Sequence, residues 1–198
     1  MPDDSSISTD VAPEPAIAYR RSRRATRTFV EWAIILVVAV LVSFLVRTYA
    51  FQTFFIPSGS MEPTLMVGDR IVVDKLSVDF GSIHRGDILV FKSPPTENCG
   101  GPPVADLVKR VVGLPGDHLT SKGNTIYVNN KPFAENWSHT EPLGPAIGNV
   151  TVPANYYFMM GDNHSDSCDS RSWGPISRSE IIGKAFIRIW PLSRVGAL

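Results

Sequence analysis

Ser58 and Ser60 flank Gly59 in the stretch FIPSGSMEPTL, residues 55–65. A serine hydroxyl can cap a turn, or it can attack a carbonyl carbon when a neighbouring group accepts its proton. A proline on each side of the pair restricts the backbone, and the glycine allows another chain to approach closely. The stretch is therefore a candidate nucleophile loop that needs a base from elsewhere in the sequence.

Lys109 is the residue best suited to be that base. In the strand-like run DLVKRVVG, alternation places Lys109 on one face with Leu107 and Val111, and Arg110 on the other. One of these two basic side chains must point toward whatever the apolar faces cover. Burial lowers the pKa of a lysine, and a fall from about 10.4 to roughly 8 leaves about a tenth of the molecules neutral at pH 7. The alternative is an edge-strand lysine whose ammonium group extends into water.

A polar cluster, GDNHSDSCDSRSWG at residues 161–174, follows the apolar run YYFMM. Asp, Asn and Ser bond to their own backbone, so a capped turn explains part of this composition. Asp169 and Arg171 could also form an ion pair that fixes the loop and directs Ser167 into a site. The spacing of the three aspartates does not match a twelve-residue calcium loop.

Other residue types exclude several kinds of site. The four histidines, His84, His118, His139 and His164, are scattered. There is no HExxH, no paired CxxC, no phosphate-binding loop and no GxGxxG. The sequence thus predicts neither a metal nor another cofactor. Nineteen basic and nineteen acidic residues cancel, so no net field favours binding to nucleic acid.

A long apolar segment, FVEWAIILVVAVLVSFLV at residues 29–46, precedes the serine stretch and contains one charge, Glu31. About 20 helical residues, at 1.5 Å each, cross a hydrocarbon core of roughly 30 Å. Five arginines between residues 20 and 27 predict a cytoplasmic N-terminus. A cleaved signal peptide usually has a shorter apolar region, and no good cleavage site follows here. We therefore expect a retained membrane anchor.

The sequence divides into three parts. Residues 1–27 are expected to be a disordered cytoplasmic tail with a basic end, residues 28–47 a transmembrane anchor, and residues 48–198 one extracytoplasmic domain. In the last part, runs rich in Val, Ile, Phe and Tyr alternate with turn segments such as HRGD, GLPGD and SKGN. This pattern predicts a mainly β fold, with an antiparallel β-sheet domain behind a single N-terminal transmembrane helix.

Four stretches in this order resemble the bacterial type I signal peptidases: PSGSMEPTL at 57–65, GDRIVVDK at 68–75, KRVVGLPGD at 109–117 and GDNHSDSCDSR at 161–171. Any one of them could occur by chance, but all four behind an N-terminal anchor form a specific pattern. The resemblance implies a membrane-bound serine endopeptidase that uses a Ser/Lys dyad to remove N-terminal signal peptides from secretory preproteins. It also implies small substrate residues at the first and third positions before the cleaved bond.

The resemblance assigns the central chemical roles. Ser60 matches the nucleophile, and Lys109 matches the general base. The Ser58 hydroxyl and the Ser60 backbone N–H match the two donors of the oxyanion hole. Met61 matches the methionine beside the nucleophile.

Supporting roles and two departures also follow from the resemblance. Ser167 matches a serine that orients the lysine, and Asp169 and Arg171 match a supporting ion pair. His164 stands where the family usually has an arginine, so we expect weaker electrostatic support there at neutral pH. The segment 117–161 is short for the family, which implies a reduced accessory subdomain.

The family implies a single-pass protein of the bacterial plasma membrane, with its catalytic domain outside the cytoplasm. The implied partners are secretory preproteins and membrane lipid, not nucleic acid, and the residues do not define an oligomeric state. One alternative is a related anchored Ser/Lys protease with another extracytoplasmic substrate, which a panel of altered preproteins would distinguish. The other is a non-enzymatic anchored β domain that binds envelope partners, for which no covalent serine adduct is expected.

A disulfide between Cys99 and Cys168 is a further hypothesis, because these are the two cysteines of a domain expected outside the cytoplasm. The bond would tie the loop that precedes Lys109 to the polar cluster. Mass spectrometry of the unreduced protein is expected to show a mass two hydrogens below that of the reduced protein. Two free thiols before reduction would exclude the bond.

Overall fold

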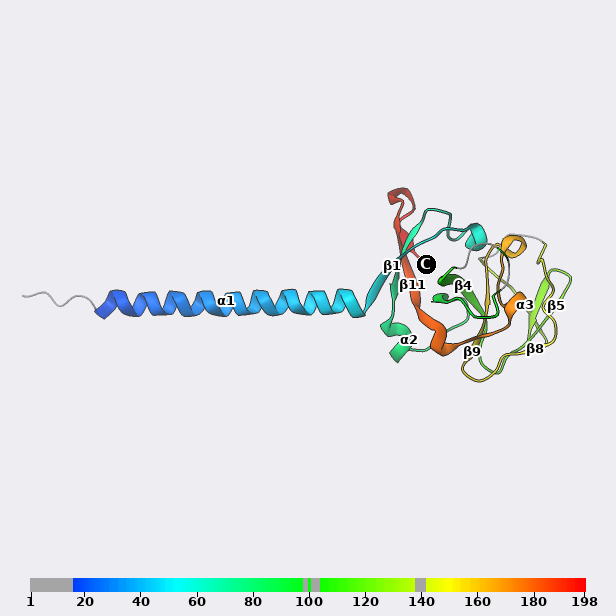
Figure 1. Cartoon of the computed structure of the whole chain (residues 1–198), viewed down its shortest axis with the longest axis horizontal. Coiled ribbons are helices and arrows are strands. Elements are labelled where there is room, and N and C mark those ends of the chain that lie inside the picture. Colours follow the sequence, from blue (N-terminus) through cyan, green and yellow to red (C-terminus); the bar gives the residue numbers. More distant parts are fainter. Residues whose placement is uncertain (1–15, 98–99, 101–103, 138–141) are drawn as a thin grey trace, which may run out of the picture. The chain divides into compact units, whose positions relative to one another are not determined.

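The computed structural model describes residues 16–97, 100, 104–137 and 142–198. Within these residues the chain forms one long helix, several short helices and two antiparallel sheets (Figure 1). The chain divides into two compact units, Met1–Leu45 and Val46–Leu198. The expectation of a mainly β fold with one N-terminal apolar helix is confirmed.

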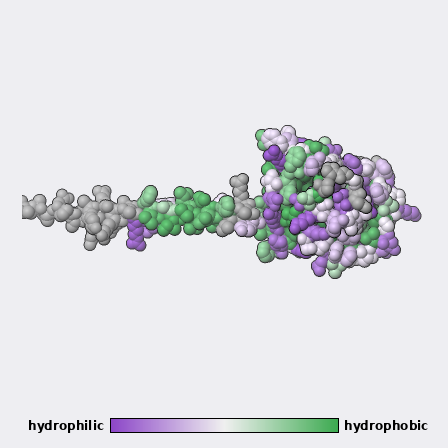
Figure 2. All heavy atoms as spheres, in the orientation of Figure 1, coloured by the Kyte–Doolittle hydropathy of each residue, from purple (hydrophilic) through white to green (hydrophobic). Residues whose placement is uncertain are grey.

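The long helix, α1 (Ala16–Tyr49), contains an 18-residue segment, Arg27–Phe44, that is long and apolar enough to cross a membrane. None of this segment is buried inside the protein, and Figure 2 shows its apolar side chains on the helix surface. A helix that is apolar on every face and covered by no protein is stable in an apolar solvent, which is consistent with a membrane anchor. Because α1 extends beyond residues 28–47 at both ends, the limits of the anchor remain a prediction.

The larger sheet is the framework of the second unit. Its strands are hydrogen-bonded in the order β1-β2-β11-β3-β4-β9-β10, β12 pairs with β11, and each pairing is antiparallel. The strands are β1 (Phe51–Phe55), β2 (Arg70–Asp74), β3 (Ile88–Lys92), β4 (Asp106–Gly113), β9 (Tyr156–Met160), β10 (Ile176–Ser177), β11 (Ile181–Trp190) and β12 (Gly196–Ala197).

The central strand of this sheet, β3, is largely shielded from water. Strand β3 lies between β11 and β4, and its residues Ile88–Phe91 are buried at four consecutive positions. A continuous run of buried apolar residues is typical of a strand that is covered on both faces. In the register of β3 with β4, Leu89 lies opposite Lys109. This pairing carries a lysine into the interior of the domain.

The smaller sheet lies within the segment 117–161, which was expected to be a reduced accessory subdomain and which also contains β9 of the larger sheet. The order of the smaller sheet is β7-β6-β5-β8, with β5 (His118–Lys122), β6 (Thr125–Val128), β7 (Lys131–Phe133) and β8 (Val150–Thr151). Asn129 and Asn130 join β6 to β7 with φ values of 52° and 65°. Asparagine tolerates this left-handed conformation, which two-residue hairpin turns require.

The short helical elements lie at the ends of strands and carry much of the polar chemistry. The α-helices are α2 (Leu76–Phe80) and α3 (Ser170–Trp173), and the 3₁₀ turns are η1 (Gly59–Met61), η2 (His164–Asp166), η3 (Arg178–Glu180) and η4 (Leu192–Arg194). Met61 and Leu65 pack with Ile71 and Val90 in one core cluster. This packing anchors the end of η1 and the chain that follows it, and so holds Ser60 close to the sheet.

Candidate active site

Ser60 and Lys109 lie in direct contact, although 48 residues separate them along the chain. Ser60 is in η1 and Lys109 is in the middle of β4. Lys109 Nζ lies 2.5 Å from Ser60 Oγ. Lys109 is 3% exposed and Ser60 is 9% exposed, so the contact is shielded from water.

Burial lowers the pKa of Lys109 from 10.5 to about 8. Loss of hydration is the largest cause, because the ammonium form depends more on water than the neutral amine does. The negative charge of Asp169 acts in the opposite direction, and the positive charge of Arg171 again lowers the pKa. At a pKa of about 8, roughly a tenth of the lysine side chains are neutral at pH 7.

Strand β4 buries two adjacent basic residues on its opposite faces. The alternation predicted that Lys109 or Arg110 would point inward, and the structure buries both, with Arg110 7% exposed. Arg110 donates from Nε and Nη2 to the two carboxylate oxygens of Asp162, at 2.8 and 2.6 Å. Its guanidinium carbon also lies 4.7 Å from the ring centre of Trp137. Arg110 is therefore bound to a carboxylate, whereas the hydrogen bond of Lys109 goes to a hydroxyl that can exchange a proton with it.

The Asp169 carboxylate connects the expected supporting residues. It is fully buried and lies 2.7 Å from Arg171 Nη2 in an ion pair. The Ser167 hydroxyl donates to Asp169 Oδ2 at 2.8 Å, and Gly161 N donates to the same oxygen at 3.1 Å. The direct orientation of Lys109 by Ser167 remains a prediction, since this hydrogen bond of Ser167 goes to Asp169.

Gly161 allows the polar cluster to pack directly against Ser60. A Cβ atom at this position would lie 2.3 Å from Ser60 O and 2.3 Å from Ser167 Oγ. Only a glycine fits between these atoms, because real Cβ contacts are much longer. The loop that begins at residue 161 therefore packs against the backbone of Ser60.

Asn163 is a supporting residue that the sequence interpretation missed. Its backbone N–H donates to Ser60 O at 3.1 Å, and its Nδ2 donates to Gly59 O at 3.2 Å. The available signal was its place in the GDN triplet at the start of the polar cluster. Asn163 fixes the backbone of η1 and thereby restricts the position of the Ser60 side chain.

Ser58 and a cleft complete the site. Ser58 is exposed, and its Oγ lies 3.5 Å from Ser60 Oγ. A cleft of about 340 Å³ opens beside the two serines. Its lining is mostly apolar and consists of Phe54, Phe55, Ile56, Pro57, Ser58, Ser60, Met61, Val104, Asp106, Leu107, Val108 and Lys109. A peptide segment with small apolar side chains fits this chemistry.

His164, which departs from the family pattern, and Cys168 both lie within the polar cluster. His164 is 4% exposed, and its Nε2 lies 3.3 Å from Glu135 Oε2. The expected weaker support from this histidine at neutral pH remains a prediction. Cys168 is not a free thiol, and its expected partner, Cys99, lies outside the residues that the structure describes. In those residues no three His, Cys, Asp or Glu side chains are grouped so that they could hold a metal ion.

The antiparallel fold, the apolar N-terminal helix and the contact between Ser60 and Lys109 are consistent with a membrane-anchored serine hydrolase. Residues 29–190 match the family described as signal peptidase, peptidase S26. The chain is 38% identical over 172 residues to a probable signal peptidase I-2 from Synechocystis, covering 86% of this chain and 78% of the relative. It is 33% identical over 186 residues to signal peptidase I T from Bacillus subtilis, covering 89% and 93%. A signal peptidase I from Mycobacterium tuberculosis is 34% identical, with 98% and 81% covered.

This chain therefore belongs to the signal peptidase family, peptidase S26. The expectations of the family and of the serine endopeptidase class are confirmed. The contacts among the site residues come from the structure, and the role of each one in the reaction is part of the proposal below.

The lowered pKa of Lys109 makes the stability of the fold depend on pH. Between pH 8 and 10.5 the unfolded chain binds more protons than the folded chain, so the free energy of unfolding rises with pH in this range. A Lys109→Met variant lacks this titration and buries no charge. We expect the variant to be more stable than wild type at pH 7 and to lose roughly 3 kcal/mol of that advantage by pH 10.5. Chemical unfolding of both full chains in detergent measures the difference, and a difference independent of pH would contradict the buried-lysine assignment.

Proposed function

We propose that this chain cleaves signal peptides from secretory preproteins, with Ser60 as the nucleophile and Lys109 as the general base. The observation that carries the proposal is the 2.5 Å contact between Lys109 Nζ and Ser60 Oγ, at a lysine whose pKa is about 8. Neutral Lys109 accepts the hydroxyl proton as Ser60 Oγ attacks the scissile carbonyl carbon. The resulting ammonium group then protonates the leaving amine, and a water molecule deprotonated by Lys109 hydrolyses the acyl-enzyme.

The oxyanion is proposed to form between the Ser58 hydroxyl and the Ser60 backbone N–H. The 3.5 Å separation of Ser58 Oγ from Ser60 Oγ supports this role, because a carbonyl attacked by Ser60 would lie within reach of the Ser58 hydroxyl. Such donors stabilise the tetrahedral intermediate more than the substrate, by about 2.7–4 kcal/mol for one donor. The two serines of the motif therefore have different tasks, since one attacks and the other stabilises charge.

The substrate is proposed to lie extended in the cleft beside β4. Strand β3 pairs with β4 from Asp106 to Arg110, whereas β9 pairs with β4 only from Arg110 onward. The other edge of Asp106–Lys109 faces the cleft, where backbone groups can pair with an extended peptide. The cleft of about 340 Å³ favours short side chains next to the cleaved bond.

Asp169 and Arg171 are proposed to keep Lys109 available as a base. A buried carboxylate near a lysine stabilises the ammonium form and so raises its pKa, as Asp169 does here. The ion pair with Arg171 offsets this effect and lowers the pKa of the same lysine. Ser167 holds the shared carboxylate in place through its 2.8 Å hydrogen bond to Asp169.

The membrane position proposed for the chain is the bacterial plasma membrane, with the N-terminus in the cytoplasm and the β domain outside. The apolar segment Arg27–Phe44 and the arginines that precede it support this orientation. An enzyme and a signal peptide that share one bilayer meet at a raised effective concentration without an additional contact.

The proposed orientation can be tested by protease accessibility. A chain with an N-terminal epitope tag is expressed in bacteria, which are then converted to spheroplasts. We expect added protease to degrade the β domain and to leave the tag protected until detergent opens the membrane. Loss of the tag before detergent is added, with the β domain intact, would contradict the orientation.

Substitution of the proposed catalytic residues tests the mechanism. We expect Ser60→Ala and Lys109→Ala each to lower kcat for preprotein cleavage by about 10⁵–10⁶-fold. Ser58→Ala is expected to lower kcat by about 10²–10³-fold with little change in KM. The exposed Ser179 provides a control, since Ser179→Ala should leave both constants unchanged.

The wild-type kcat/KM in the same experiment should rise with pH through the Lys109 pKa of about 8, because the neutral amine is the active form. Retention of cleavage by Ser60→Ala and Lys109→Ala would overturn the mechanism.

A further inference from the structure

The loop that carries Ser60 is closed at its base by backbone hydrogen bonds. Ile56 N donates to Asp69 O at 2.9 Å, and Gly68 N donates to Ile56 O at 2.9 Å. Residues 56–69 therefore form a closed loop, which we call the nucleophile loop. Asp69 is 1% exposed, and its carboxylate accepts a hydrogen bond from Met66 N at 2.9 Å.

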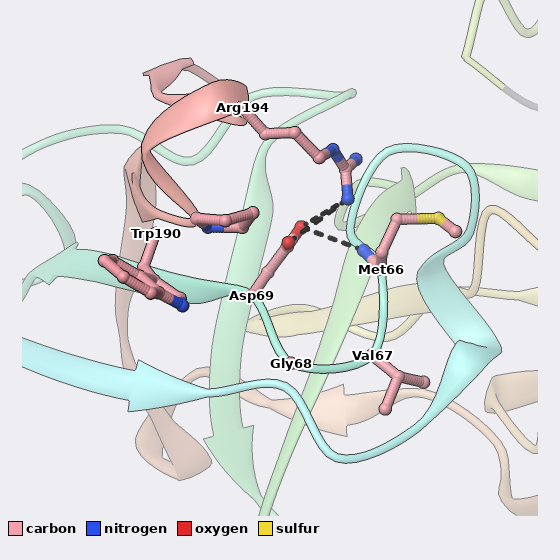
Figure 3. A pocket seen from close by; sticks show the side chains of 7 residues that line it. Met66, Val67, Gly68, Asp69, Trp190 and Arg194 are labelled. Atoms are coloured by element: carbon pink, nitrogen blue, oxygen red, sulfur yellow. Dashed lines mark hydrogen bonds and ion pairs between the residues drawn. The ribbon is translucent and has the colours of Figure 1, made fainter.

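Two arginines from the C-terminal end of the chain bind this loop. Arg194, in η4, donates from Nη1 to both carboxylate oxygens of Asp69 at 3.1 Å. Its Nη2 reaches Pro63 O at 3.3 Å and Thr64 O at 3.4 Å. Arg188, near the end of β11, donates from Nη1 to Thr64 O at 2.6 Å. Figure 3 shows Arg194 beside Asp69, with Met66 N bonded to the same carboxylate.

The two arginines are themselves linked. Arg188 Nε donates to the backbone oxygen of Arg194, and Arg188 Nη1 lies 3.7 Å from Asp69 Oδ2. The three side chains form a compact unit with two positive charges and one negative charge, which we call the C-terminal clamp (Asp69, Arg188 and Arg194). Charge-assisted hydrogen bonds of this kind are about twice as strong as neutral ones.

Residues 66–69 of the nucleophile loop are only partly packed against other apolar groups. A pocket of about 610 Å³ is lined by Met66, Val67, Gly68 and Asp69 on the loop, and by Trp190, Pro191 and Arg194 on the C-terminal segment (Figure 3). Val67 is 57% exposed and Trp190 is 50% exposed. Because an open pocket separates these apolar groups, the hydrogen bonds of the clamp supply much of the restraint on this side of the loop.

Thr64 connects the clamp to the rest of the site. Its carbonyl oxygen accepts from Arg188 and Arg194, and its Oγ1 accepts from Arg110 Nη2 at 3.4 Å. Arg110 is the neighbour of Lys109 in β4, and Thr64 lies four residues after Ser60. The clamp thus acts on the backbone that leaves Ser60, whereas Asn163 holds the backbone at Ser60 itself.

We propose that Arg188 and Arg194 are positioning residues for the Ser60 nucleophile. They fix the Pro63 and Thr64 carbonyls, and through them set the distance from Ser60 Oγ to Lys109 Nζ. Neither arginine is among the residues that line the cleft in the described part of the chain, so substrate binding does not depend on them directly. This inference rests on the proposed role of Ser60.

Arg194→Met tests the clamp in the full-length protein in detergent. We expect kcat for a preprotein to fall by roughly 10- to 100-fold, because a shift of about 1 Å in a reacting group can cost 10²-fold in rate. KM is expected to change by about twofold at most, much less than kcat, since neither arginine lines the cleft. The rate of Ser60 modification by an acylating active-site probe should fall in parallel with kcat.

Arg194→Lys separates the clamp from a general loss of stability. A lysine retains the charge that faces Asp69, but it cannot reproduce the planar fork that reaches the carboxylate and the two carbonyls together. We expect this variant to recover most of the melting temperature while kcat stays low. A purely structural role would restore kcat together with the melting temperature.

Arg178→Met is the matched control. Arg178 also binds backbone oxygens, those of Val78 and Gly81, and it donates to the Tyr157 hydroxyl at 3.2 Å. These contacts hold the α2 region and not the nucleophile loop. The control is expected to lower the melting temperature with kcat of the folded enzyme unchanged.

The proposal is overturned if Arg194→Met keeps wild-type kcat, or if its kcat recovers fully in Arg194→Lys. Including Ser60→Ala separates this result from a failure of the proposed function. If Ser60→Ala is inactive and Arg194→Met is fully active, only the clamp is wrong. If Ser60→Ala retains activity, the assignment of the nucleophile itself is wrong.

Discussion

Removing the Lys109 amine from water is the constraint on which the rest of the site depends. An ammonium group loses its hydration when it is buried, and the packed sheet around β4 must offset that cost. The same loss of hydration brings the pKa to about 8, which makes the lysine usable as a base. The Asp169–Arg171 ion pair has two opposite effects on the pKa of Lys109. The carboxylate raises this pKa and the guanidinium lowers it.

The proposed nucleophile, Ser60, is held by groups from two distant parts of the sequence, the polar cluster and the C-terminal end of the chain. Asn163 bonds to the backbone of η1, Gly161 allows the polar cluster to approach within contact distance, and the C-terminal arginines bond to the loop beyond Ser60. Each group acts on the main chain and leaves the Ser60 hydroxyl available to Lys109. Such preorganisation reduces the reorganisation needed at the moment of reaction.

Much of the fold and the centre of the site could be predicted from the sequence, because both depend on local patterns. Apolar length indicated the helix, and strand alternation placed Lys109 and Arg110 on opposite faces of one strand. Alternation could not show that both are buried, since that depends on Asp162 and Trp137, which are distant in sequence. Arg194 was missed for the same reason, because its contact with Asp69 spans 125 residues and only the folded chain creates it.

The pairing of β3 with β4 has a chemical consequence as well as a structural one. Successive side chains of a strand point to opposite faces of the sheet. A shift of the β3–β4 register by one residue would therefore exchange the faces of Lys109 and Arg110. An arginine would then face Ser60, and a guanidinium does not release its proton at any pH that a protein survives. In the proposed mechanism the alignment of the two strands therefore selects the base, and a chain folded in the shifted register would be inactive rather than partly active.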